Sequence, residues 1–217
     1  MKRMDNTTIM LLGGCISAII PMLFVAVMVK DVDSQRIIVF FAWGVFASLL
    51  SYGLNMFFGA EQGDLERITT TVAPLVEEIC KGVPVILFLR KKKHPRVTEQ
   101  IVYNALASGV GFSILESIYY FSISTGSAGD VILLIIRALT TTLMHGMSTA
   151  VLGIGLLILQ NQRQILLPVI FSLLALSACI HALFNLLLPT ELAAVAMLMP
   201  IALYFAGLVI IRNETER

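Results

Sequence analysis

Five ionisable residues stand out because each lies inside a long apolar stretch of the sequence. They are Glu77, Glu78, Glu116, His145 and His181. An ionised side chain at bilayer depth costs roughly 2.5–3.5 kcal/mol on insertion scales, so such residues usually face a polar site that neighbouring helices shield from lipid. We therefore expect these five groups to serve a function rather than to be scattered by chance.

Side chains of these types support hydrolytic chemistry. A glutamate in a cavity shielded from bulk water can act as a general base that takes a proton from water and returns it to a leaving amine. A nearby histidine or asparagine can stabilise the oxyanion of a tetrahedral intermediate. The same groups can instead bind a divalent metal ion that activates the water. A serine nucleophile is not indicated, because the sequence contains no GxSxG motif.

The composition predicts a membrane protein. Of the 217 residues, 58% are hydrophobic and only 13% are charged, whereas soluble domains have about 25% charged residues. The net charge of +1 and the lack of a basic patch interleaved with aromatic residues argue against a nucleic-acid partner. The three cysteines all lie in apolar stretches, and we expect them to be reduced.

Seven apolar segments are long enough to cross a bilayer, which takes about 20 helical residues. The predicted spans are 9–29, 37–58, 72–90, 100–122, 131–159, 165–187 and 192–211. We predict an all-α, polytopic membrane bundle of about seven transmembrane helices. The fifth span is longer than an upright helix needs, and we expect one unbroken helix there.

The whole chain, residues 1–217, is predicted to form a single membrane domain with three parts. Residues 1–71 are expected to hold two N-terminal helices and an acidic outer loop, and residues 188–217 a C-terminal helix. Between them, residues 72–187 are expected to form a catalytic core of four helices.

The basic residues predict how the bundle is oriented, because loops rich in Lys and Arg stay in the cytoplasm. The basic run at 90–96 is the strongest such signal, and alternation of the spans then places ten basic residues on its side and three on the other. The N-terminus is thus expected outside and the C-terminus in the cytoplasm. At 1.5 Å per residue, Glu77, Glu116, His145 and His181 then lie roughly 8–12 Å below the outer face. This common depth predicts a shared site.

Helical spacing adds two residues to this predicted site. Lys81 follows Glu77 by four residues and Glu78 by three, so its ammonium group can reach either carboxylate. Asn185 follows His181 by four residues and therefore lies on the same helical face.

Four motifs occur in a fixed order on four of the predicted helices. They are EExxK at 77–81, FxxxE at 112–116, a helix with Arg137 and His145, and HxxxN at 181–185. In this order the sequence resembles the PrsW group of bacterial intramembrane proteases, which belongs to a superfamily with the CAAX prenyl proteases and the APH-1 subunit of γ-secretase. The CAAX branch typically has EExxxR and FxxxH, so the chain is more similar to the PrsW side.

The resemblance implies a multi-pass protein of the bacterial cytoplasmic membrane. Its activity would be hydrolysis of a peptide bond near the extracytoplasmic face, and its partners a membrane-anchored protein substrate and the lipid bilayer. In the best-known family role the substrate is an anti-sigma factor, cut first at this site. The resemblance leaves open whether the protein uses no cofactor or a divalent metal ion, for which zinc is a candidate.

Matching positions in the motifs also imply roles for the acidic and basic residues. Glu77 and Glu78 would activate water, with Glu77 favoured as the base. Glu116 would share a proton with this pair or orient the water. Lys81 and Arg137 would be supporting charge partners that keep the carboxylates oriented.

The same matching implies roles for the remaining polar residues. His145 and His181 would polarise the scissile carbonyl or bind a metal ion, and Asn185 would complete the oxyanion pocket. Some relatives have an acidic residue at the position of Asn185, so a metal-binding role for this position stays open. The candidate metal ligands are Glu78, Glu116, His145 and His181.

Two other functions compete with the protease. One is a catalytically silent scaffold or substrate-binding subunit, but such a subunit has little use for the adjacent buried acids Glu77 and Glu78. The other is an ion-coupled transporter. The small size, the lack of a detectable inverted repeat and the single depth of the ionisable groups count against it.

Overall fold

The structure is a computed structural model that describes residues 6–28, 34–59, 68–90, 99–122, 128–159 and 163–215. Within these ranges the chain is helical, with short turns and no β-strand, which confirms the all-α fold class. The seven α-helices are α1 (Asn6–Met28), α2 (Ser34–Gly59), α4 (Ala73–Arg90), α5 (Gln100–Ser122), α6 (Ala128–Ile158), α7 (Leu166–Leu187) and α8 (Ala193–Thr215). A π-helical turn, η1 (Ile68–Val72), leads into α4, and a 3-10 turn, η2 (Arg163–Ile165), leads into α7.

Each of the seven predicted spans coincides with one α-helix. The fifth is a single helix as predicted, because α6 continues without a break for 31 residues. The helices α2, α5, α6, α7 and α8 are long and apolar enough to cross a membrane by length and composition, which confirms a multi-pass membrane protein. The helix α4 has 18 residues, of which four are charged. The predicted orientation and the three-part division of the chain stay predictions.

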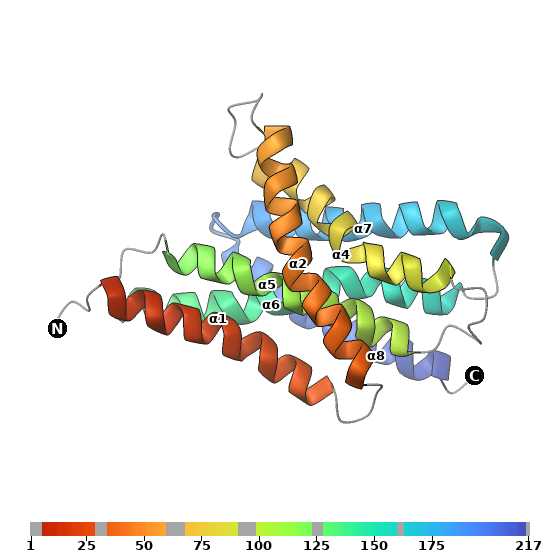
Figure 1. Ribbon diagram of the computed structural model, residues 1–217, viewed down its shortest axis with the longest axis horizontal. Helices are drawn as coiled ribbons and strands as arrows, with labels where there is room; N and C mark the ends of the chain where they lie inside the picture. The colour runs from red at the N-terminus through yellow and green to blue at the C-terminus, as the bar shows by residue number, and fades with distance from the viewer. Residues whose placement is uncertain are drawn as a thin grey trace.

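Helix α5 lies at the centre and packs along α6, with α2 and α1 against its other sides (Figure 1). Glycines permit this close packing. A Cβ atom on Gly44 of α2 would collide with the Ser108 carbonyl oxygen of α5, and one on Gly109 of α5 would collide with the His145 carbonyl oxygen of α6. Small residues of this kind let membrane helices approach closely. The α5 backbone is thereby pressed against the turn of α6 that holds His145.

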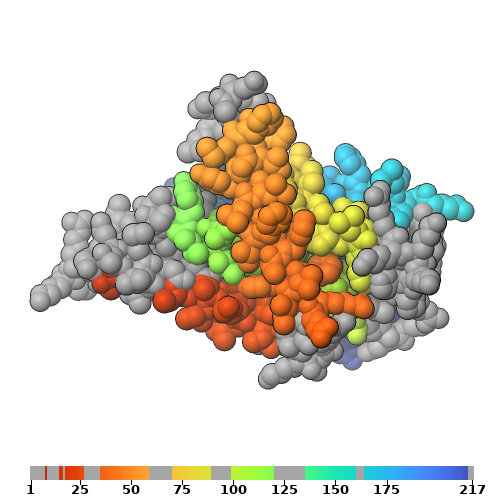
Figure 2. Space-filling model, viewed as in Figure 1, coloured from red at the N-terminus to blue at the C-terminus, as the bar shows by residue number. Residues whose placement is uncertain are grey.

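Helix α2 covers the middle of the face seen in Figure 2. It turns large apolar side chains outward, among them Ile38, Val39, Phe46 and Leu49, which are all exposed. Such a surface suits contact with lipid rather than with water. The inner face of α2 packs on α5 and α4, so α2 shields the centre of the bundle from this side.

The long helix α6 has two different buried faces. On one face lie the polar residues His145, Ser148 and Thr149, and on the opposite face lie Met147 and Ala150. The polar face packs toward α4 and α7, which supply the other ionisable groups, as described below. The apolar face belongs to the main hydrophobic core.

Candidate active site

One turn of α4 supplies three ionisable groups, Glu77, Glu78 and Lys81. Glu78 and Lys81 are both buried, and the Lys81 Nζ lies 2.6 Å from Glu78 Oε1. A buried ion pair is stable only when further hydrogen bonds compensate for the lost hydration of both charges. The stability of this ion pair therefore depends on the hydrogen bonds that surround it.

Glu78 receives hydrogen bonds from three more side chains, two on α6 and one on α7. Its Oε1 accepts from Ser148 Oγ at 2.7 Å and from His181 Nδ1 at 2.9 Å, and its Oε2 faces Thr149 Oγ1 at 3.4 Å. Together with the ammonium of Lys81, these donors occupy both oxygens. Because an ionised carboxylate only accepts hydrogen bonds, Glu78 acts as a buried anchor that joins α4, α6 and α7.

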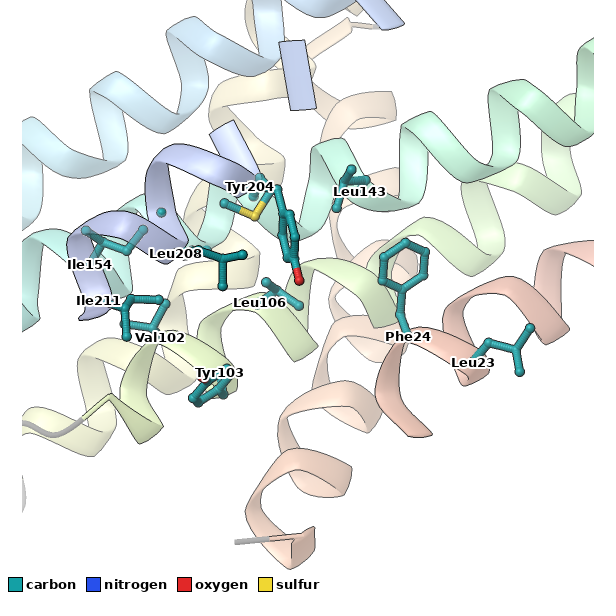
Figure 3. A pocket seen from close by; sticks show the side chains of 13 residues that line it. Leu23, Phe24, Val102, Tyr103, Leu106, Leu143, Ile154, Tyr204, Leu208 and Ile211 are labelled. Atoms are coloured by element: carbon teal, nitrogen blue, oxygen red, sulfur yellow. The ribbon is translucent and has the colours of Figure 1, made fainter. Parts of the chain in front are cut away.

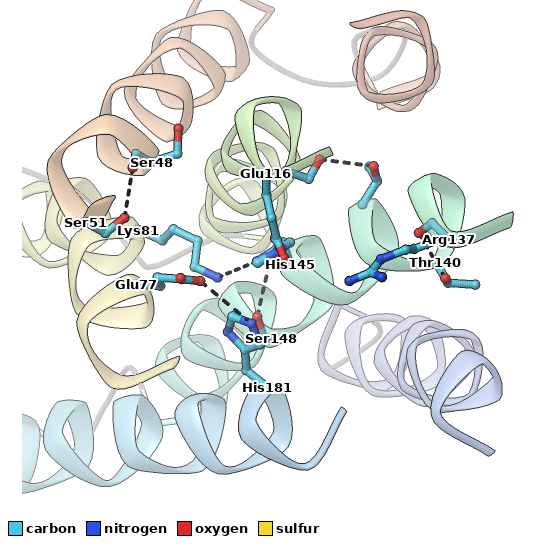
Figure 4. Close-up of polar contacts among 12 residues, drawn as sticks. Ser48, Ser51, Glu77, Lys81, Glu116, Arg137, Thr140, His145, Ser148 and His181 are labelled. Carbon is cyan, nitrogen blue, oxygen red and sulfur yellow. Dashed lines mark hydrogen bonds and ion pairs between the residues drawn. The ribbon is translucent and has the colours of Figure 1, made fainter. Parts of the chain in front are cut away.

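His145 of α6 has a defined arrangement of hydrogen bonds. Its Nδ1 lies 3.0 Å from Lys81 Nζ, and its Nε2 contacts the Glu116 carboxylate of α5 (Figure 4). An ammonium group can only donate, so Nδ1 is the acceptor, and Nε2 carries the proton and donates to Glu116. The centre of the Phe112 ring lies 5.1 Å from the centre of the His145 ring and 4.8 Å from Lys81 Nζ. His145 thus joins α5 to the ion pair of α4.

His181 of α7 lies in the same cluster, with its ring 4.8 Å from the ring of His145. Since its Nδ1 donates to Glu78, the neutral ring has a free lone pair on Nε2. That atom is 3.8 Å from Glu77 Oε2, which is too long for a hydrogen bond (Figure 4). Glu77 is 16% exposed and lies at the open side of the cluster.

The residue types of this cluster fit a divalent metal ion, which His145 could bind only by giving up its contact with Lys81 or with Glu116. One ligand atom each from Glu77, His145 and His181 lie within 4.8 Å of one another. Two histidines and one glutamate are a common set of protein ligands at catalytic zinc sites. The Nδ1–H group of His181 also donates a hydrogen bond to the Glu78 carboxylate. Hydrogen bonds of this kind orient histidines that bind a metal through their other nitrogen.

The group shares two residues with the four metal ligands expected from the sequence and contains neither of the two expected glutamates. It contains His145 and His181 but has Glu77 as its carboxylate. Glu78 and Glu116 instead contact the two histidine rings. The roles of all these residues stay proposals, although the structure brings them together.

Two further predicted residues lie at the edge of the cluster. Arg137 is two turns before His145 on α6, and its side chain extends toward the side of the cluster where Glu116 lies (Figure 4). Asn185 is half-buried one turn beyond His181 on α7, and its part in an oxyanion pocket stays a prediction.

Sequence reasoning missed Ser148 and Thr149 as partners of Glu78. Both follow His145 by one turn, at three and four residues, so helical spacing was the available signal. It also missed the contact that fixes α4 against α2. Pro84 has no N–H to offer the carbonyl of Cys80 four residues earlier, and Trp43 Nε1 donates to that carbonyl at 3.0 Å.

The fold and the cluster together define a multi-pass helical membrane protein with a buried glutamate–histidine site. The model of the PrsW family of intramembrane metalloproteases matches residues 34–211. The chain therefore belongs to the PrsW family, as its four motifs indicated. No curated protein and no solved structure matches it.

Proposed function

We propose that this PrsW-family protein is an endopeptidase that hydrolyses a peptide bond of a membrane-anchored protein, with the Glu/His cluster as its active site. Membership of a protease family supports the reaction class. The observation that supports the location is the convergence of Glu77, His145 and His181, from α4, α6 and α7, to within 4.8 Å.

The donor set and the family description both favour a divalent metal ion held by Glu77, His145 and His181. When bound, such an ion would supply Lewis acidity, which polarises the scissile carbonyl and makes a water molecule more acidic. His181 would be kept in the required tautomer by its hydrogen bond to Glu78.

Glu116 is the carboxylate best placed to move the proton. It is 23% exposed, whereas Glu78 is buried with both oxygens occupied. A Glu116 oxygen would accept a proton from the attacking water and return it to the leaving amine. In a metal-free mechanism, Glu77 would take that part instead, because it is the other partly exposed carboxylate.

The substrate and the side of cleavage are narrower parts of the proposal. The family resemblance favours an anti-sigma factor held in the bacterial cytoplasmic membrane. The charge bias of the predicted loops favours a site in the outer half of the bilayer. Cleavage would then occur near the extracytoplasmic face.

The proposal is tested with purified protein in liposomes and a single-span model substrate. Glu77→Gln should remove cleavage and lower the bound metal, measured by mass spectrometry of the elements, to well below one ion per chain. The conservative control Ser51→Ala changes a buried α2 hydroxyl that, within the described part of the chain, bonds its own helix at Ala47 and Ser48, and it should keep both cleavage and bound metal. Cleavage that survives exhaustive chelation would favour the metal-free mechanism. Full cleavage by Glu77→Gln would rule out this active site.

A further inference from the structure

An apolar cavity lies on the opposite side of α6 from the Glu/His cluster. It measures about 600 Å³ and is bounded by α1, α5, α6 and α8 (Figure 3). Helix α6 contributes Leu143, Met147, Ala150 and Ile154, whose spacing places them on one helical face. A volume in the range of about 300–1,000 Å³ is typical of sites for single small ligands.

The walls of this cavity are almost entirely apolar. Its side chains are aliphatic or aromatic, and their only polar atoms besides the Met147 sulfur are the hydroxyls of Tyr103 and Tyr204. The ring of Tyr204 reaches from α8 toward the space between Leu106 and Phe24 (Figure 3). Walls of this composition select an apolar ligand and offer no partner for a charged one.

The cavity is elongated along α6. Its lining runs along α6 from Leu143 to Ile154, a length of about 16 Å at 1.5 Å per residue. An elongated apolar space of this volume suits a slender hydrocarbon chain.

The mouth of the cavity opens onto the lipid-facing surface of the bundle. Leu23 of α1 is 60% exposed at this mouth, while Ala150 of α6 at the floor is fully buried. Helix α8, which forms another wall, is apolar and long enough to span the membrane. Any occupant must therefore enter from the hydrocarbon of the bilayer, where lipid acyl chains are the ligands at hand.

We propose that this cavity is a binding site for one acyl chain of a membrane phospholipid. The bound chain would lie against Met147 and Ala150, the neighbours in sequence of Ser148 and Thr149 that donate to Glu78. It would thus fill the space behind the α6 turn that holds the polar cluster. The inference does not rest on the proposed protease activity.

The test is native mass spectrometry of the full chain after incubation with phosphatidylglycerol with palmitoyl and oleoyl chains. One phospholipid should remain bound to the wild-type protein when the surrounding detergent has been removed by activation. Gly207→Phe would fill the cavity, because a Cβ at Gly207 lies only 3.2 Å from Met147 Cε and 3.3 Å from Ile154 Cδ1. We expect at least about a tenfold loss of bound lipid, since excluding two methylene groups from an apolar site costs about that factor.

The matched control is Ala206→Phe, which adds the same ring one position earlier, where the α8 side chain is exposed. This variant should retain the lipid as the wild type does. Leu143→Phe provides a milder filling variant if Gly207→Phe does not fold. Equal retention by the filled and control variants, or retention of only detergent or free fatty acid by the wild type, would overturn the proposal.

Discussion

At the scale of single residues, the position of Glu78 explains why two adjacent glutamates have different surroundings. Successive residues on a helix point about 100° apart, so Glu78 faces inward toward Ser148 and His181 while Glu77 lies at the open side of the cluster. Spacing alone predicted that Lys81 could reach either acid. It could not predict the choice, because a partner such as His181 is 103 residues away and depends on which helices become neighbours.

Ser148 offers a test of how the buried carboxylate is held. Ser148→Ala removes a 2.7 Å hydrogen bond to Glu78 Oε1 and should lower the free energy of unfolding by about 1–3 kcal/mol, the cost of losing a partner of a buried polar group. Cleavage should fall as well, because Glu78 orients His181. Unfolding in detergent and cleavage in liposomes measure the two effects.

Ser113→Ala is the matched control for this prediction. Ser113 is also fully buried and donates to Thr142 Oγ1 at 3.0 Å, on the α5–α6 contact. We expect a similar loss of stability but nearly unchanged cleavage. If both variants lost cleavage to the same degree, Ser148 would act only through general stability.

At the scale of helices, close backbone approach is what aligns the site. Apolar length predicted the existence of all seven helices and their ends to within four residues, because that signal lies within each segment. The order of packing could not be read in the same way, since many pairs of small residues would allow close contact. The structure places Gly44 against Ser108, Gly109 against His145 and Gly111 against Phe41. The partner that each glycine meets depends on which helices become neighbours.

The same contact gives a prediction for α2. Gly44→Ala should destabilise the protein by about 1–3 kcal/mol, the usual cost of overpacking, because the new methyl group meets the Ser108 carbonyl oxygen. Gly53→Ala on the same helix has nothing within 4 Å of the added carbon and should be neutral or slightly stabilising. Thermal unfolding of both variants in detergent compares them. Equal stability would mean that α2 and α5 do not touch at Gly44.

At the scale of the whole molecule, seven membrane-crossing helices would place the two termini on opposite sides. The charge bias predicts which side is which, and cysteine labelling can check it. In a chain without its three native cysteines, Gln62→Cys should react with an impermeant maleimide in intact cells, because residues 61–66 are predicted to lie outside. Lys92→Cys, in the basic run, should react only after permeabilisation. The reverse pattern would invert the bundle and place the site in the cytoplasmic half.

The continuous length of α6 has a mechanical consequence. Its 31 residues extend about 46 Å at 1.5 Å per residue, whereas the hydrocarbon layer is about 30 Å thick. If α6 stood upright, it would therefore extend about three turns beyond the hydrocarbon layer. If it were tilted, more of its length would lie within that layer. Its apolar window begins only at Ile135, so the surplus belongs mainly to the turns that precede Arg137. If the proposed site lies in the outer half of the bilayer, a protein approaching along the membrane surface would meet these turns of α6 before it reached the site.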